Sequence, residues 1–177
     1  IGQARVKKNN HPKLREIYEL SLKFYTNNIN TAKGKEAKNY LLKRGLNDEV
    51  IKNFQIGLAL NSHDALTKIL LKKYDIKDLL NSSLVAQNDY GYHDIFYGRI
   101  MFPLYDLEGN VVGYSGRIYD REDPSKYFNS RETEIFKKGE LLYNYHRAKD
   151  KARANNQIIV MEGFMDVIAA YRAGIEN

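Results

Sequence analysis

The pattern of apolar residues changes near Leu84, and this change constrains the fold more than any other feature of the sequence. Upstream of it, helical spacing of apolar residues predicts helices over 12–28, 32–44, 48–53, 64–73 and 76–80, with one short strand over 54–60. Downstream, β-branched and aromatic residues are interrupted by Gly, Asn and Asp, as is typical of an antiparallel sheet. We therefore expect an α+β fold in which a helical N-terminal lobe lies on a mixed, largely antiparallel sheet.

The clearest strand signal is a hairpin. Residues 99–105 and 111–118 have strand composition and flank the turn-forming segment 106–110, whose sequence is DLEGN. The next segment, 119–138, is polar and keeps neither a helical nor a strand period, which favours a loop with a function. Residues 143–154 return to a helical pattern. The hairpin is therefore expected to form the core of the sheet.

The end of the chain begins a second structural unit. Residues 157–161 form an apolar run typical of a buried strand, and Gly163 separates it from an apolar-striped helix over 164–171. A lone strand and helix cannot bury their own faces, so we expect partner strands downstream of this chain. The sequence therefore predicts one domain over 1–154 and the start of a second over 155–177.

Composition excludes several classes of protein. The chain has 177 residues, and no apolar run approaches the roughly 20 residues that a membrane helix needs. The first residues carry no hydrophobic signal-peptide core, so we expect a soluble cytoplasmic protein without a membrane partner. The sequence has no cysteine, and its 4 histidines show no metal-ligand spacing. Any metal would be held by carboxylates, whose oxygen ligands suit magnesium or manganese rather than structural zinc.

The positive charge of the chain is concentrated at its N-terminal end. The net charge is +6, while residues 1–45 hold eleven Lys or Arg and three Asp or Glu, a local excess of +8. Such a segment is either a solvated helical face or a surface that contacts a nucleic-acid backbone. The charge alone leaves both interpretations open.

Two carboxylates near the end of the chain are candidates for chemistry. Glu162 directly follows the predicted strand, and Asp166 lies four residues later, in the first turn of the next helix. A crevice at the carboxyl end of a strand is a common ligand site, and a Glu there can bind a divalent ion or transfer a proton. In the alternative interpretation, Glu162 is a favourable helix-start residue and Asp166 a solvated charge.

A second group of candidates lies in the loop and in the strand before it. The loop 124–133 alternates cations, aromatic rings and small polar groups, a mixture that can hold phosphates and stack a base, or can simply be a solvated surface. Glycines flank the segment before Arg117, which predicts either a close approach of a ligand or a bulge. We place Arg117 at the sheet edge, with Arg99 able to reach the same face. Arg44 has the simplest alternative, a cation at a helix C-terminus.

Several segments of the chain resemble, in order, motifs of the bacterial-type (DnaG) DNA primase family. They are Tyr40-Leu41 to Arg44-Gly45-Leu46 with Ile51 and Ile56-Gly57, Arg99 to Leu104, Gly113 to Arg117, Lys126 to Ser130 with Glu132-Thr133 and Phe136, and Glu162-Gly163-Phe164-Met165-Asp166-Val167. The last segment resembles the signature that opens the Toprim domain of these enzymes. Because the motifs occur in family order over nearly the whole chain, together they are far more specific than any one of them alone.

The resemblance implies an activity, a set of site residues and a set of partners. The activity is a nucleotidyltransferase, a DNA-dependent RNA polymerase that makes short RNA primers on single-stranded DNA for replication from ribonucleoside triphosphates. Glu162 is implied as the acidic catalytic residue and a ligand of Mg²⁺ or Mn²⁺, with Asp166 supporting the same site. The implied nucleotide- or DNA-binding residues are Arg44, Arg99, Arg117, Lys126, Tyr127, Asn129, Ser130 and Lys138.

The resemblance also implies parts that this sequence does not contain. A Toprim site needs an aspartate and an Asp-x-Asp pair on later strands, and the family carries a zinc-binding domain and a region that binds the replicative helicase. Two-metal nucleotidyl transfer needs several carboxylates, so the 177 residues alone are expected to be inactive. The sequence also departs from the family pattern at Tyr97, Arg131 and Glu140, where the family usually has arginine, proline and a cation.

Two other functions stay open at this stage. One is a binding module without catalysis, which holds single-stranded DNA or a nucleotide through Arg117 and Lys126. The other is a Toprim nuclease or a topoisomerase-like enzyme, which the primase-like segments over residues 40–140 argue against. A shared Toprim fold alone would not decide between these chemistries.

Overall fold

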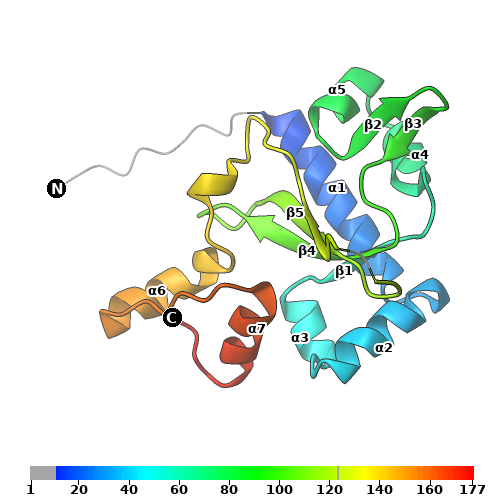
Figure 1. The fold of residues 1–177 in the computed structure, drawn as a ribbon. Coiled ribbons are helices and arrows are strands. Elements are labelled where there is room, and N and C mark those ends of the chain that lie inside the picture. The colour runs from blue at the N-terminus through cyan, green and yellow to red at the C-terminus, as the bar shows by residue number, and fades with distance from the viewer. Residues whose placement is uncertain (1–10, 123) are drawn as a thin grey trace.

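The computed structural model describes residues 11–122 and 124–177 and has the expected α+β architecture (Figure 1). The helices are α1 (Pro12–Asn28), η1 (Ala32–Gly34), α2 (Lys35–Lys43), α3 (Asp48–Asn53), α4 (Ala65–Leu70), α5 (Ile76–Asn81), η2 (Lys138–Glu140), α6 (Tyr145–Asn155) and α7 (Phe164–Arg172). The strands are β1 (Gly57–Ala59), β2 (Val85–Asn88), β3 (Gly91–Asp94), β4 (Arg99–Tyr105), β5 (Val111–Arg117) and β6 (Tyr127–Asn129). The helices that the sequence predicts therefore all form, although the one expected over 64–73 is shorter and the one over 32–44 begins as a 3-10 turn.

All strand pairs in the described part of the chain are antiparallel. The main sheet has the order β1-β4-β5-β6, and β2 and β3 form a separate two-stranded sheet. The strand β6 lies inside the segment that the sequence predicts to be a loop. It has only three residues and a polar surrounding sequence, so no period identifies it, and its pairing with β5 is what makes it a strand. Arg117 lies on β5, which pairs with β4 on one side and β6 on the other. The expectation that Arg117 lies at the sheet edge is therefore wrong.

The two faces of the main sheet carry different clusters of apolar residues. On one face, which we call the α1 face, Met101 packs with α1, and on the other, the α2 face, Ile100 packs with residues of α2, α3 and α7. The helix α1 crosses the first face so closely that a Cβ atom on Gly57 would lie 2.5 Å from the backbone carbon of Tyr25. Glycine is therefore required where this helix meets β1.

Local sequence signals explain several element boundaries. Asn47 caps α3, since its side-chain oxygen accepts the N–H of Val50 at 2.9 Å. Gly45 follows α2 with φ of +84°, a left-handed conformation that glycine adopts without strain. These two residues lie in the turn between α2 and α3, which both pack on the α2 face.

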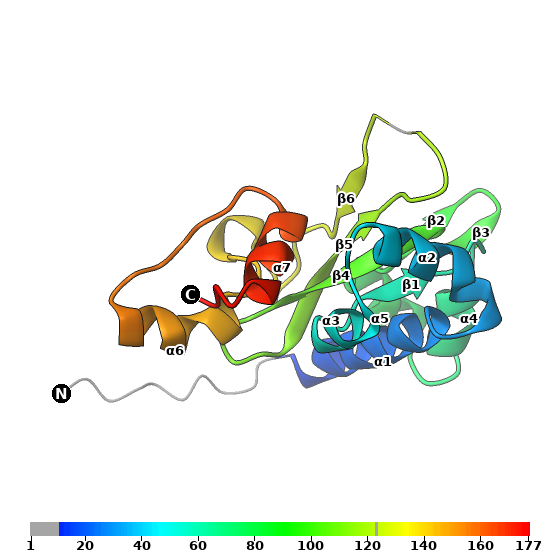
Figure 2. The same ribbon diagram turned by 90° about the horizontal axis from the view of Figure 1, so that it is seen from below.

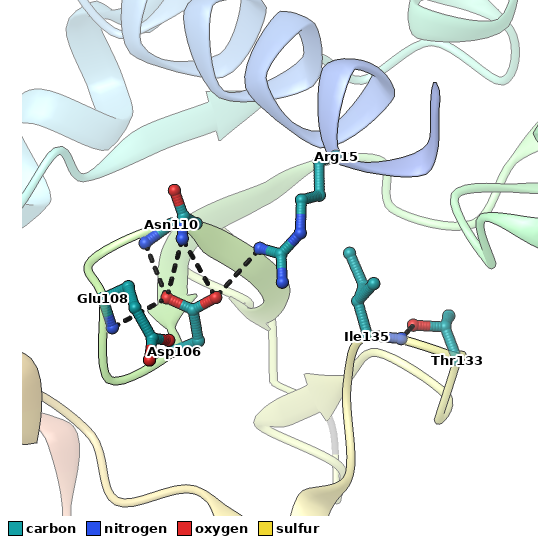
Figure 3. A network of polar contacts seen from close by, with 6 residues as sticks. All are labelled: Arg15, Asp106, Glu108, Asn110, Thr133 and Ile135. Carbon is teal, nitrogen blue, oxygen red and sulfur yellow. Dashed lines mark hydrogen bonds and ion pairs between the residues drawn. The ribbon is translucent and has the colours of Figure 1, made fainter. Parts of the chain in front are cut away.

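The turn between β4 and β5 is tied to α1 through one carboxylate (Figure 3). Asp106 accepts the backbone N–H groups of Glu108 and Asn110 at 3.1 and 2.8 Å, which closes the turn. Its other oxygen accepts a hydrogen bond from Arg15 of α1 at 2.9 Å. The hairpin is thus held against the first helix of the chain.

The C-terminal segment differs from the expectation in one respect. No strand forms over residues 157–161, and the side chains of Ile158, Ile159 and Val160 are 47, 41 and 68% exposed. A strand needs a neighbour that pairs with its backbone, and none of the described strands lies beside this segment. The helix α7 does form, and its Ile168 is fully buried in the cluster of the α2 face. Figure 2 shows α6 and α7 together at one end of the molecule.

Candidate functional site

Arg117 lies between two tyrosine rings on the α2 face. Its Nε donates to the hydroxyl of Tyr40 at 2.9 Å, and Nη1 donates to the hydroxyl of Tyr127 at 2.5 Å. The guanidinium carbon is 5.7 Å from the ring centre of Tyr40 and 4.9 Å from that of Tyr127. Burial alone would lower the pKa of Arg117, but the two tyrosines outweigh it, so the pKa lies above its usual value. The arginine is therefore a fixed, charged donor.

This arginine borders an open pocket of about 630 Å³. The pocket is lined by Tyr40, Arg117, Ile118, Tyr119, Arg121, Glu122, Pro124 and Lys126. The sequence candidates Arg117 and Lys126 thus meet around one cavity, and Tyr127 reaches it through its contact with Arg117. Three cations and two aromatic rings around one opening can hold a phosphate and stack a flat group.

Arg99 lies on the opposite face of the sheet, so the expectation that it shares a face with Arg117 is wrong. The strand register pairs Ile100 with Arg117, and successive residues of a strand point to opposite faces. The guanidinium of Arg99 donates to the carbonyl of Gly116 at 3.1 Å and lies 5.8 Å from the ring centre of Phe128. By the same alternation, the side chains of the adjacent residues Tyr127 and Phe128 point to opposite faces of the sheet.

Aromatic rings surround Arg99 on the α1 face. Phe128 is 36% exposed and packs edge-on against Phe96, with ring centres 5.5 Å apart. Tyr97, which follows Phe96 in the sequence, is 37% exposed, and its ring lies 4.8 Å from that of His63. We call Arg99, Phe128, His63 and Tyr97 the aromatic platform. The sequence singled out Phe128 only as part of the loop 124–133 and did not single out His63, because the platform joins three distant segments and no spacing pattern links them.

A second cavity joins residues from the second half of the chain. Asn129, Lys138 and Glu162 line one cavity of about 290 Å³, whose other walls are mostly apolar side chains of α6, α7 and the segment between them. The Oδ1 atom of Asn129 is buried and accepts no hydrogen bond from the described residues. The cavity thus combines an exposed cation, an exposed carboxylate and an unpaired acceptor.

Asp166 does not line this cavity with Glu162 but folds back on the start of its own helix. A Cβ atom on Gly163 would lie 2.8 Å from Oδ2 of Asp166, so glycine leaves room for that carboxylate. The two carboxylates are oxygen donors of the kind that magnesium or manganese prefers. Within residues 11–122 and 124–177, however, no group of three or more His, Cys, Asp or Glu could hold a metal ion. The donors fit in kind but are too few to form a complete site.

The remaining candidates have simpler surroundings. Ser130 is buried, its hydroxyl accepts the N–H of Tyr114 at 2.9 Å, and its own N–H donates to the carbonyl of Tyr114 at 2.8 Å. Arg44 is exposed directly after α2 and lines neither cavity. Ser130 therefore fixes the end of β6, and Arg44 stands apart from the other candidates.

The sheet carries a cationic, aromatic pocket on one face and an aromatic platform on the other. Such surfaces are typical of proteins that bind nucleic acids and nucleotides. Residues 24–149, more than half of the chain, match the family model for the N-terminal domain of the DNA primase catalytic core. The chain therefore belongs to the DnaG-type DNA primase family, and the resemblance in its motifs is confirmed.

Relatives and solved structures agree with this assignment. The chain is 41% identical to a DNA primase of Enterococcus faecalis over 94% of its own length and 43% identical to one of Staphylococcus aureus over 92%. It spans only 27 and 28% of the length of these two relatives. A DnaG primase catalytic domain bound to single-stranded DNA superposes with a TM-score of 0.84 at 35% identity, over 92% of this chain and 51% of that one.

None of the helices that the structure describes has the length and apolar character that crossing a membrane requires.

Proposed function

We propose that this chain forms the N-terminal part of the catalytic core of a DNA primase, which synthesises short RNA primers on single-stranded DNA. One observation carries the proposal. In a chain whose relatives are DNA primases, the separate motif residues Asn129, Lys138 and Glu162 come together around one cavity. An arrangement of a cation, an acceptor and a carboxylate suits a nucleotide whose phosphates must be held beside a reacting centre.

The α2 face is the proposed binding side for incoming ribonucleotides. Arg117 offers a rigid fork that matches phosphate oxygens, and Lys138 adds an exposed point charge after β6. Lys126 directly precedes the edge strand β6, where the two faces meet, and is proposed to contact a template phosphate. The unpaired Oδ1 of Asn129 can accept a hydrogen bond from a ribose hydroxyl or a base amine. Ser130 acts indirectly, because it fixes the strand end that carries Asn129.

The α1 face is the proposed binding side for the template strand. The aromatic platform presents partly exposed rings on which unpaired bases can stack, and its Arg99 is held by the carbonyl of Gly116 and the ring of Phe128. Stacking on aromatic rings tolerates any base, as a template-reading enzyme requires. The solved relative bound to single-stranded DNA supports a partner of this chemical class. Arg44, exposed after α2, is proposed to contact a phosphate of the same polyanion or of the nucleotide.

Glu162 and Asp166 are proposed to hold Mg²⁺ or Mn²⁺ together with carboxylates from outside these 177 residues. The ion, when bound, would offset the negative charge on the reacting phosphates. The residues described here contribute by orienting the nucleotide through Arg117, Lys138 and Asn129 and by placing one carboxylate beside it. Cytoplasmic location, ribonucleotide substrates and a replicative helicase partner are part of the same proposal.

The decisive experiment measures primer synthesis by a longer protein that contains these residues, on single-stranded DNA with ribonucleotides and magnesium or manganese. Glu162→Gln should abolish synthesis, because the amide keeps the shape of the side chain but loses the charge that holds the ion. The matched control is Glu176→Gln, which changes a carboxylate that lines the same cavity but pairs with Lys151. Synthesis should survive in the control, and equal activity of both variants would exclude the role of Glu162.

Binding to DNA by the chain itself provides a second test. Lys126→Ala should weaken binding and reduce the slope of log affinity against log salt by about 1, since one phosphate contact is lost. Lys23→Ala removes an exposed cation of α1 that lines neither cavity and should leave the slope unchanged. A folded parent that makes no primers, while the chain still binds DNA in this way, would favour the non-catalytic binding module.

A further inference from the structure

The β2–β3 hairpin carries two exposed tyrosines at its outer end. Tyr90 is 100% exposed at the turn and Tyr92 is 40% exposed on β3. The turn is ordered, since the side-chain oxygen of Asn88 accepts the N–H of Tyr90 at 2.9 Å and Gly91 adopts φ of +118°. A fully exposed aromatic ring on a well-formed turn contributes nothing to the core.

The base of this hairpin is anchored beside the aromatic platform. The N–H of Asp94, at the end of β3, donates to the carbonyl of His63 at 2.6 Å. The buried carboxylate of Asp94 accepts the N–H groups of Leu66 and Thr67 at 2.9 and 2.7 Å, which fixes the hairpin to the start of α4. The hairpin therefore continues directly from the segment that carries the ring of His63. Figures 1 and 2 show it at the end of the molecule away from α6.

We propose that Tyr90 and Tyr92 extend the template-binding surface beyond the aromatic platform, by stacking on further unpaired bases of single-stranded DNA. This inference rests on the proposed function. Four residues separate Tyr90 from Asp94, so the extension covers roughly 13 Å of strand, or about four nucleotides at the 3.4 Å spacing of a stacked strand.

The surroundings of the two rings favour a nucleic acid over a protein partner. Their neighbours on the hairpin are the polar Gln87 and Asn88 and the exposed acidic Asp89, so the rings do not form the continuous apolar patch that a protein interface buries, and affinity for DNA must come from the rings themselves. Isolated rings on a polar support suit base stacking, which uses the two faces of each ring and tolerates any base. The hairpin also contains no Lys or Arg over residues 85–94.

This absence of cations gives the proposal a specific signature. Phosphate contacts produce salt dependence, whereas stacking does not release counterions. The hairpin should therefore add affinity for long strands without adding to the salt slope. Substitutions at Tyr90 and Tyr92 should lower affinity at every salt concentration by the same factor, unlike Lys126→Ala, which changes the slope.

The test measures fluorescence anisotropy of this chain with labelled oligothymidylates of roughly 4 and roughly 12 nucleotides, lengths that bracket single-strand site sizes. The variant Tyr90→Ala with Tyr92→Ala should bind the long strand more weakly, by about fivefold or more for each ring lost, and the short strand as the parent does. The control Tyr90→Phe with Tyr92→Phe keeps both rings and should bind like the parent.

Four results would be informative. Loss confined to the long strand, with an unchanged salt slope, supports the proposal. Unchanged binding of the long strand by the alanine variant, confirmed as folded by circular dichroism, overturns the proposal and leaves the proposed function intact. If the parent binds neither strand, the template-binding part of the proposed function fails together with this extension. Equal loss for both strands would place the tyrosines within the platform itself and would also overturn the extension.

Discussion

Gly116→Ala should destabilise the protein, because this glycine lies under the aromatic platform. A Cβ atom at Gly116 would be 2.9 Å from Cδ1 of Phe96 and 3.0 Å from Cδ of Arg99. Overpacking of this kind costs about 1–3 kcal/mol, while replacing a glycine inside a strand by alanine returns about 0.5–1 kcal/mol. The expected net loss is about 0.5–2 kcal/mol, or roughly 1–8 °C in Tm for a chain of this size. Displacement of Arg99 should also weaken binding of single-stranded DNA.

Gly113→Ala is the matched control on the same strand. A Cβ atom at Gly113 would meet the ring of Phe136 at 3.4 Å, an ordinary contact distance. Gly113→Ala restricts the unfolded chain in the same way as Gly116→Ala but creates no steric clash. The Gly113→Ala variant should therefore be as stable as the parent protein or more stable. Urea unfolding followed by circular dichroism gives the free energy of unfolding of both variants. If Gly116→Ala proves as stable as Gly113→Ala, the steric argument is refuted.

Two further predictions concern the titratable side chains of Asp106 and His146. Burial alone would raise the pKa of Asp106, but hydrogen bonds from Asn110 and Arg15 outweigh it and hold the pKa below its ordinary value. The ionised carboxylate therefore stabilises the fold at pH values above the pKa of Asp106 in the unfolded chain. This stabilisation is lost as the pH falls through the lower pKa of the folded protein. Asp106→Ala should cost about 1–2 kcal/mol in urea unfolding at neutral pH, and a loss independent of pH between neutrality and acid would contradict the account. Burial, with nearby positive charge, lowers the pKa of His146 to about 4, so stability should decrease as the pH falls from the unfolded value of about 6.5 towards 4. His146→Phe keeps the ring contact with Tyr105 and should reduce this decrease, which thermal unfolding across that pH range would measure.

Local signals were sufficient to predict most helices and the central hairpin. The helix bounds of α1, the cap at Asn47 and the strand bounds of β4 agree with expectation, because each depends on residues adjacent in sequence. The α+β class follows from the same local patterns and is confirmed by the structure and its relatives. The division of the chain at residue 154 stays a prediction.

Features that depend on distant residues could not be predicted in the same way. The strand β6 exists through its pairing with β5. No described strand pairs with residues 157–161, where the N–H of Ile159 donates instead to the carbonyl of Asn177 at 3.0 Å. Glu162 and Lys138 meet at one cavity, while Arg99 and Arg117 are separated by the sheet, and no local spacing encodes either outcome. The family resemblance identified these residues as one set but did not indicate on which face of the sheet each of them lies.

The short strand β6 explains why one motif contributes to two surfaces. Tyr127 and Asn129 point to the α2 face and Phe128 to the α1 face, since side chains alternate along a strand. A shift of one residue in the pairing would exchange these faces and disrupt both surfaces at once. With only three residues in the strand, the register depends strongly on its ends. Ser130 supplies two hydrogen bonds to Tyr114 at one end, and the carbonyl of Lys126 accepts the N–H of Ile118 at the other. The buried serine therefore supports both surfaces, as the residue that holds the strand in register.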